Sequence, residues 1–127
     1  MFQLDVMSRI PVYEQIINQF EEFVLRGIFK KGDKLPSVRA MSSSLSINPN
    51  TIQKAYLELD RRGLTCSVPG KGVFVSESAL ECITNERRGR LDIISDAARE
   101  LKLAGIPMEE AIAAVKSVYK EGGEIND

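Results

Sequence analysis

Two short helical segments separated by a turn of only three residues constrain the fold of this chain more than any other feature of its sequence. The first segment begins at Ser37, a residue type that caps helix N-termini, and carries Val38, Met41 and Leu45 on one face. Residues 46–48 (SIN) then form the turn before the second segment. Two helices joined by so short a connection form a helix-turn-helix.

The second helix of this pair has clear start and stop signals. Asn48 is a preferred cap residue, Pro49 suits the first helical position, and Gly63 is placed to end the helix. A 3/4 spacing of apolar residues predicts that one face is buried, with Ile52, Ala55, Tyr56 and Leu59. The outward face at the N-terminal end is polar and contains Asn50, Thr51, Gln53 and Lys54.

A first helix and a β-hairpin are predicted on either side of the helix-turn-helix. Pro11 opens a helix with an apolar stripe over residues 12–24, and Gly27 ends it. After the helix-turn-helix, β-prone runs flank the tetrapeptide PGKG at residues 69–72, which predicts a hairpin with a basic, glycine-rich tip. A helix-turn-helix followed directly by a hairpin is the layout of a winged helix domain.

Helical periodicity returns after the hairpin. The spacing of apolar residues predicts one continuous helix from Ile83 to Gly105, and Pro107 begins a last helix. The predicted fold class is mainly α with a small β-hairpin (α+β). A winged helix-turn-helix DNA-binding domain at residues 1–76 is followed by two C-terminal dimerisation helices in residues 77–127.

The C-terminal helices carry an apolar stripe that a unit of about fifty residues cannot bury by itself. The stripe must therefore pack on the winged helix or against a second chain. Helix-turn-helix proteins usually bind DNA as twofold dimers, which favours the second chain, while docking within one chain is the alternative. The residues expected at the dimer interface are Leu91, Ile94, Ala98, Leu101, Ile112 and Val115.

Positive charge is concentrated where DNA binding is expected. The 127 residues carry a net charge of −1, yet residues 30–75 contain eight Lys and Arg against three Asp and Glu. The polar face at residues 50–54 is suited to base edges in the major groove. Arg39 is placed for a phosphate, or is simply a solvent-exposed arginine, and Lys71 with Gly72 supplies the tip of the wing. The predicted partner is double-stranded DNA, and a protein–protein interaction module is the alternative function.

Other classes of function lack the residues they need. The chain has no histidine and only two cysteines, Cys66 and Cys82. We therefore expect no enzymatic activity, no metal site and no bound cofactor. The cysteines are interpreted as reduced and structural. No apolar stretch is long enough for a membrane span and no secretory signal begins the chain, which predicts a cytoplasmic protein. No small-molecule effector is identified, and one would have to bind between domains or subunits.

Four motifs, in this order, resemble the GntR family of bacterial regulators. They are PVYEQI at residues 11–16, LPSVR at 35–39, NPNTIQKAY at 48–56 and PGKGVFV at 69–75. The resemblance covers roughly residues 9–76 and implies a winged helix that binds DNA through Arg39, Asn50, Thr51, Gln53 and Gly72.

The short C-terminal part narrows the resemblance further. It is similar to the YtrA-like branch of the family, in which two helices after the wing form the dimer and no large effector domain exists. The family's metal-binding histidines have no counterpart here, because the chain has none. The resemblance favours a repressor, and the twofold symmetry of the expected homodimer predicts an inverted-repeat operator.

Overall fold

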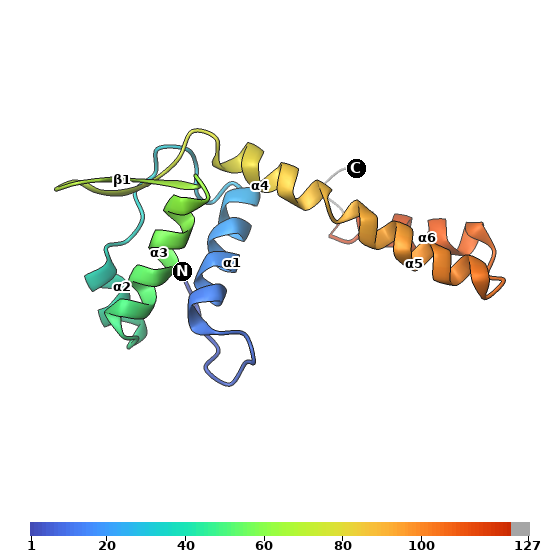
Figure 1. The fold of residues 1–127 in the computed structure, drawn as a ribbon, viewed down its shortest axis with the longest axis horizontal. Coiled ribbons are helices and arrows are strands. Elements are labelled where there is room, and N and C mark those ends of the chain that lie inside the picture. Colours follow the sequence, from blue (N-terminus) through green and yellow to red (C-terminus); the bar gives the residue numbers. More distant parts are fainter. Residues whose placement is uncertain (123–127) are drawn as a thin grey trace. The chain divides into compact units, whose positions relative to one another are not determined.

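A computed structural model describes residues 1–122, and over these residues the chain forms six helices and one β-hairpin (Figure 1). Backbone contacts divide it into two compact units, of which the first spans Met1–Glu86 and the second begins at Arg87. The predicted fold class, mainly α with a small hairpin, is confirmed. The elements are α1 (Val12–Leu25), α2 (Val38–Leu45), α3 (Pro49–Arg61), β1 (Thr65–Val68), β2 (Gly72–Val75), α4 (Ala79–Arg88), α5 (Leu91–Leu103) and α6 (Met108–Tyr119).

The turn between α2 and α3 is built by the residues that the sequence indicated. The Ser37 hydroxyl accepts a hydrogen bond of 3.0 Å from the Ala40 amide and so caps α2. Ser46 adopts the left-handed conformation (φ 57°, ψ 44°) that ends α2. The Asn48 side chain then accepts a hydrogen bond of 2.8 Å from the Asn50 amide at the start of α3. Both helix ends are therefore fixed by local hydrogen bonds.

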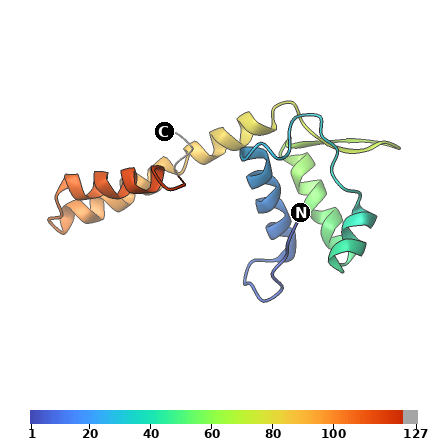
Figure 2. The same cartoon turned by 180° about the vertical axis from the view of Figure 1, so that it is seen from behind.

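The core of the first unit lies where α1 and α2 pack against α3 (Figures 1 and 2). Its fully enclosed side chains come from these helices, from the connection before α2 and from α4; the largest are Phe20, Ile16, Leu35, Ile52, Leu59 and Ile83. Ile83, at which the predicted continuous C-terminal helix begins, is thus a core residue of the first unit. It is unavailable to any other partner because no part of it is exposed.

The hairpin pairs β1 and β2 in an antiparallel register in which Thr65 faces Val75 and Val68 faces Gly72. The Lys71 amide closes the turn by donating a hydrogen bond of 2.9 Å to the Val68 carbonyl. The connection before α2 pairs with the hairpin at one position, where Lys34 forms an antiparallel bridge with Phe74. The wing is therefore anchored on the chain segment that leads into the helix-turn-helix.

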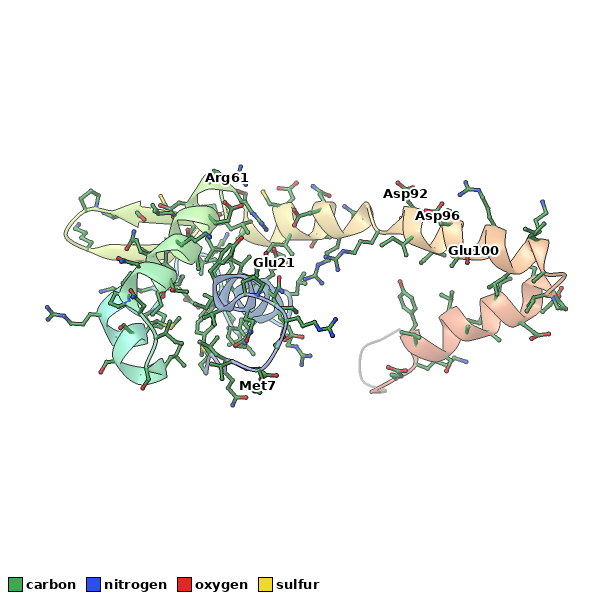
Figure 3. All side chains as sticks on the ribbon, turned by 60° about the horizontal axis from the view of Figure 1, so that its bottom comes forward. Met7, Glu21, Arg61, Asp92, Asp96 and Glu100 are labelled. Atoms are coloured by element: carbon green, nitrogen blue, oxygen red, sulfur yellow. The ribbon has the colours of Figure 1, made fainter. Side chains whose placement is uncertain are left out.

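The second unit contains α5 and α6, which pack on each other. The continuous helix predicted from Ile83 to Gly105 is wrong, because residues 89 and 90 form a turn that separates α4 from α5. Gly89 explains the break, since glycine is the least favourable helix former after proline. On α5 the acidic residues Asp92, Asp96 and Glu100 follow one side of the helix (Figure 3).

Candidate nucleic-acid interface

The exposed face of α3 presents hydrogen-bonding side chains. Asn50 and Gln53 are exposed, whereas Ile52, Ala55, Tyr56 and Leu59 on the opposite face are buried. Thr51 lies at the edge of the exposed face and is half-buried. Amides on the first turns of a helix match the donor and acceptor pattern of base edges in the major groove. We refer to α3 below as the recognition helix.

Two further residues of the recognition helix differ from the simple picture of a polar face. The Lys54 ammonium lies 4.0 Å from the centroid of the Tyr13 ring on α1, in a cation–π arrangement. A contact between Lys54 and DNA therefore requires the lysine to leave this ring or the DNA to approach it there. Leu57, which the sequence analysis did not single out, is 59% exposed on the same face as Gln53.

The recognition helix is held in place from its buried side. The Tyr56 hydroxyl donates a hydrogen bond of 2.6 Å to the carbonyl of Pro36, the residue immediately before the Ser37 cap of α2. Tyr56 is almost fully buried, and this burial raises its pKa, so the hydroxyl stays protonated and remains a donor. The hydrogen bond links the start of α2 to the middle of α3, which fixes the relative position of the two helices.

Arg39 lies in the first turn of α2, where it is exposed. It makes no ion pair within residues 1–122, so its guanidinium is available to a phosphate. A helix that crosses the DNA backbone presents its first turn to phosphates in helix-turn-helix proteins. The structure thus places Arg39 on the first unit together with the recognition helix and the wing.

The tip of the wing combines a cation with two glycines in conformations that side chains rarely adopt. Gly70 has φ +76° and Gly72 has φ +130°, and Lys71 between them is exposed. A groove of about 480 Å³ lies between the wing and the start of α2, lined by Ser37, Tyr56, Lys71 and Gly72 among others. The wing residues and the capped end of α2 therefore share one surface.

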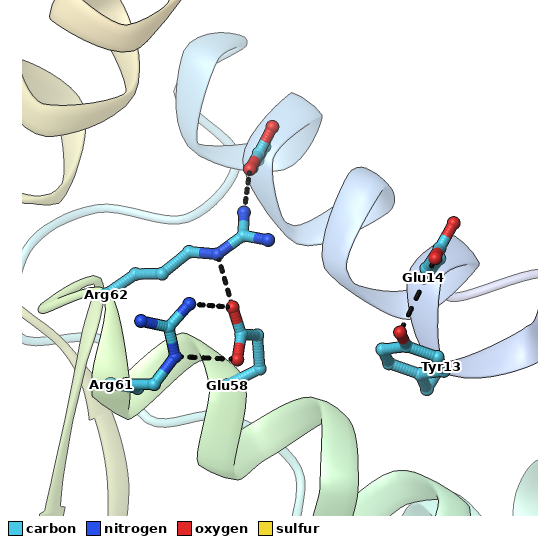
Figure 4. A network of polar contacts seen from close by, with 6 residues as sticks. Tyr13, Glu14, Glu58, Arg61 and Arg62 are labelled. Atoms are coloured by element: carbon cyan, nitrogen blue, oxygen red, sulfur yellow. Dashed lines mark hydrogen bonds and ion pairs between the residues drawn. The ribbon is translucent and has the colours of Figure 1, made fainter.

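Ion pairs that the sequence analysis missed surround the C-terminal end of α3. The Glu58 carboxylate accepts hydrogen bonds from Arg61, at 2.6 and 2.9 Å, and from Arg62 at 2.8 Å (Figure 4). These bonds lower the pKa of Glu58 to about 2, with the bond from Arg61 the largest cause. Arg62 also reaches Glu21 on α1, at 3.3 Å, and the Glu21 side chain is only 6% exposed.

A second polar link joins α3 to the wing. The Asp60 carboxylate accepts hydrogen bonds from the hydroxyls of Thr65 and Ser67 on β1, the latter at 2.6 Å. The i to i+3 and i to i+4 spacings of Glu58 with the two arginines could have been found in the sequence. The links to Glu21 and Ser67 join different elements, and no local spacing indicates them.

The remaining predictions about sites concern cysteines, metals and membranes. Cys66 and Cys82 are free, in agreement with the interpretation that they are reduced, and both are exposed. Within residues 1–122 no three His, Cys, Asp or Glu side chains gather closely enough to hold a metal ion. Every helix over the same residues is too short or too polar to traverse a bilayer.

The chain is similar to known regulators of transcription. The family described as bacterial regulatory proteins, gntR family, matches residues 12–75. The HTH-type transcriptional repressor YtrA of Bacillus subtilis (strain 168) is 38% identical over an alignment of 133 residues that covers 100% of both chains.

Two solved structures extend this similarity to the fold. A GntR family transcriptional regulator from Listeria monocytogenes superposes with a TM-score of 0.71 and 33% identity, over 90% of this chain and 98% of that chain. AraR(DBD) in complex with operator ORE1 superposes with a TM-score of 0.51 and 26% identity, over 60% of this chain and 93% of that chain.

Proposed function

Because the chain belongs to the gntR family of bacterial regulatory proteins, we propose that it is a transcriptional repressor that binds an inverted-repeat operator as a homodimer. The family makes it a DNA-binding regulator of transcription and not an enzyme. Repression is inferred from the name of the full-length relative YtrA. We assign DNA binding to residues 1–76 and, within residues 77–127, dimerisation to α5 and α6.

The observation that carries the proposal is the exposed amide face of the recognition helix. Asn50 and Gln53 are suited to bidentate hydrogen bonds with adenine, and Thr51 to a base edge or a thymine methyl. Leu57, further along the same face, is suited to a thymine methyl as well. A protein–protein module would present apolar anchors in place of the amides.

Cations around the recognition helix would position it on the duplex. Arg39 on α2 and Lys71 on the wing would bind phosphates, and the flexible glycine Gly72 lets the wing backbone approach the sugar-phosphate chain. Lys54 would contact guanine or phosphate after leaving the Tyr13 ring. Such contacts set the register of the protein on DNA, whereas the amides supply the sequence preference.

Dimerisation is inferred from the apolar side chains of α5 and α6. The large residues expected at the interface are 36–60% exposed in the single chain, and Ala98 is exposed too; the large ones are Leu91, Ile94, Leu101, Ile112 and Val115. The acidic residues of α5 follow the side of the helix away from Leu91 and Ile94. We infer a second copy as the partner, since two copies related by a twofold axis cover the same surface on each other.

The proposal is tested by footprinting the protein on the promoter of its own operon. We expect protection of an inverted repeat whose half-sites are about one or two helical turns apart. A reporter driven by that promoter should be less active when the protein is present. Protection of a single half-site would contradict the homodimer, and a more active reporter would contradict repression.

A further inference from the structure

We propose that Lys34 binds a DNA backbone phosphate beside the wing, as a contact additional to Arg39 and Lys71. The proposal rests on the DNA-binding function above and concerns a residue of the connection between α1 and α2. Lys34 is exposed, and its backbone is fixed against β2 by the bridge to Phe74. On one side of this bridge the Leu35 amide donates a hydrogen bond of 2.8 Å to the Val73 carbonyl. On the other side the Val75 amide donates one of 2.8 Å to the Asp33 carbonyl.

The Lys34 side chain lies directly over a glycine of the wing. A Cβ atom at Gly72 would be only 2.7 Å from Cε of Lys34, which is closer than real Cβ atoms approach other atoms. The absence of a side chain at Gly72 therefore has two consequences. It permits the φ of +130°, and it leaves the space that the lysine occupies.

The charged side chains that line the groove beside this lysine are all positive. Lys34 makes no ion pair within residues 1–122, in contrast to Lys31, which lies 3.7 Å from Glu77. The groove between the wing and α2 has two charged lining residues, Lys34 and Lys71, and both are cations. Because no carboxylate is among its lining residues, an anion from outside the chain would be attracted to the groove.

The geometry of the groove favours a phosphate on the DNA backbone over a small free anion. It is lined by the wing, by Tyr56 of α3 and by the chain that leads into the first residue of α2, Val38, and the N-terminal end of a helix attracts negative charge. The first helix of a helix-turn-helix crosses the duplex backbone, and the wing is proposed above to contact it through Lys71. Lys34, which lines the groove together with Lys71, is placed to bind a phosphate of the backbone as well.

The test compares Lys34→Met with the unsubstituted full-length protein on a duplex of scrambled sequence and on the footprinted operator. Methionine retains the apolar stem over Gly72 and removes the charge. We expect roughly five-fold weaker binding to both duplexes at physiological salt, and a salt slope that is lower by about 0.9. Lys30→Met is the matched control, because Lys30 is an exposed lysine of the same connection that lines a different groove.

Each outcome decides the proposal. If the unsubstituted protein binds DNA, an unchanged salt slope and affinity for Lys34→Met would overturn the phosphate contact of Lys34. The proposed DNA-binding function would not be affected by that result. A loss confined to the operator would also overturn it, since a phosphate contact does not depend on sequence. If Lys34→Met melts at a lower temperature, Lys34→Arg and Lys34→Gln give the comparison instead, and the slope should fall for Gln only. Absence of salt-dependent binding by the unsubstituted protein would overturn the function as well.

Discussion

The hydroxyl of Tyr56, in the middle of the recognition helix, donates a hydrogen bond of 2.6 Å to the carbonyl of Pro36, the residue before the cap of α2. The bond spans 20 residues of sequence and joins the two helices that form the helix-turn-helix. Tyr56 is 3% exposed, so water cannot replace the tyrosine as donor without entering the core. The angle between α2 and α3 therefore depends on this polar contact as well as on apolar packing.

Replacing this tyrosine by phenylalanine should destabilise the protein with little change in packing volume. We expect Tyr56→Phe to lower the free energy of unfolding by about 1–2 kcal/mol, because the Pro36 carbonyl loses its partner. Urea denaturation measures the effect. Tyr13→Phe is the matched control, since the Tyr13 hydroxyl makes only a long, exposed contact of 3.4 Å with Glu14. Equal stability of the two variants would show that the bond to Pro36 contributes nothing.

The ion pairs of Glu58 should make stability depend on pH in the acid range. The pKa of Glu58 in the folded protein is about 2, below its ordinary value of 4.5, chiefly because Arg61 hydrogen-bonds to the carboxylate. The contribution of Glu58 to the stability of the folded protein is therefore complete above pH 4.5 and is lost as the pH falls through 2. The melting temperatures of the wild type and of Glu58→Gln should differ most at neutral pH and converge in acid.

A second carboxylate serves as the control for this measurement. Glu81 on α4 is exposed and makes no ion pair within residues 1–122, so Glu81→Gln should not give a difference that converges in acid. The same convergence for both variants would assign the acid sensitivity to the net charge of the protein and not to the arginines beside Glu58.

Some of these contacts could be predicted from the sequence and others could not, for a physical reason. Ser37 and Asn48 cap helices through bonds that span two or three residues, so the residue types alone indicate them. The pair of Arg62 with Glu21 spans 41 residues and exists only after α1 has packed on α3. Likewise, Tyr13 lies under Lys54 because of helix packing, and the sequence shows only two separate surface residues.

The C-terminal helices illustrate the limit of periodicity. Apolar spacing continues from α4 into α5, so the pattern predicts one helix, but Gly89 interrupts the backbone between them. The same pattern placed Ile83 with Leu91, although Ile83 is buried in the first unit and Leu91 is 60% exposed. Periodicity identifies an apolar face, while the partner of that face is decided by the three-dimensional fold.

Charges on the apolar side of α5 should separate the proposed dimer. The double substitution Leu91→Asp and Ile94→Asp would bury two carboxylates in an apolar interface, so we expect monomers or insoluble protein. Light scattering measures the mass. The matched control places aspartates at Ile93 and Leu103, which are 64% and 91% exposed on the same helix and lie off the stripe. A dimeric Leu91→Asp/Ile94→Asp variant would contradict the assigned interface.

The tip of the wing should contribute affinity without sequence preference. Lys71→Ala should weaken binding to the operator and to scrambled DNA by similar factors, and lower the salt slope by about 0.9 for one lost phosphate contact. Titrations of both duplexes over a series of KCl concentrations provide the slopes. An altered base preference with an unchanged slope would indicate that Lys71 contacts a base and not the backbone.

The recognition helix should determine which bases are preferred, and Gln53 is the sharpest test because it is exposed and makes no side-chain hydrogen bond within residues 1–122. Gln53→Ala should cost about 1–3 kcal/mol of binding free energy on the footprinted operator and almost nothing on scrambled DNA. Thermal melting should hardly change, since Gln53 is exposed and is not one of the buried residues of α3.

The symmetry of the proposed dimer adds a second expectation to the same experiment. Each half of an inverted repeat is contacted by one copy of the recognition helix, so Gln53→Ala should relax the preference at the same base step in both halves. Affinities for operators substituted at one step in one half or in both would measure this. Equal losses on operator and scrambled DNA would mean that Gln53 contacts only the backbone. A preference relaxed in one half alone would contradict the twofold arrangement, because two identical helices related by a twofold axis make identical contacts.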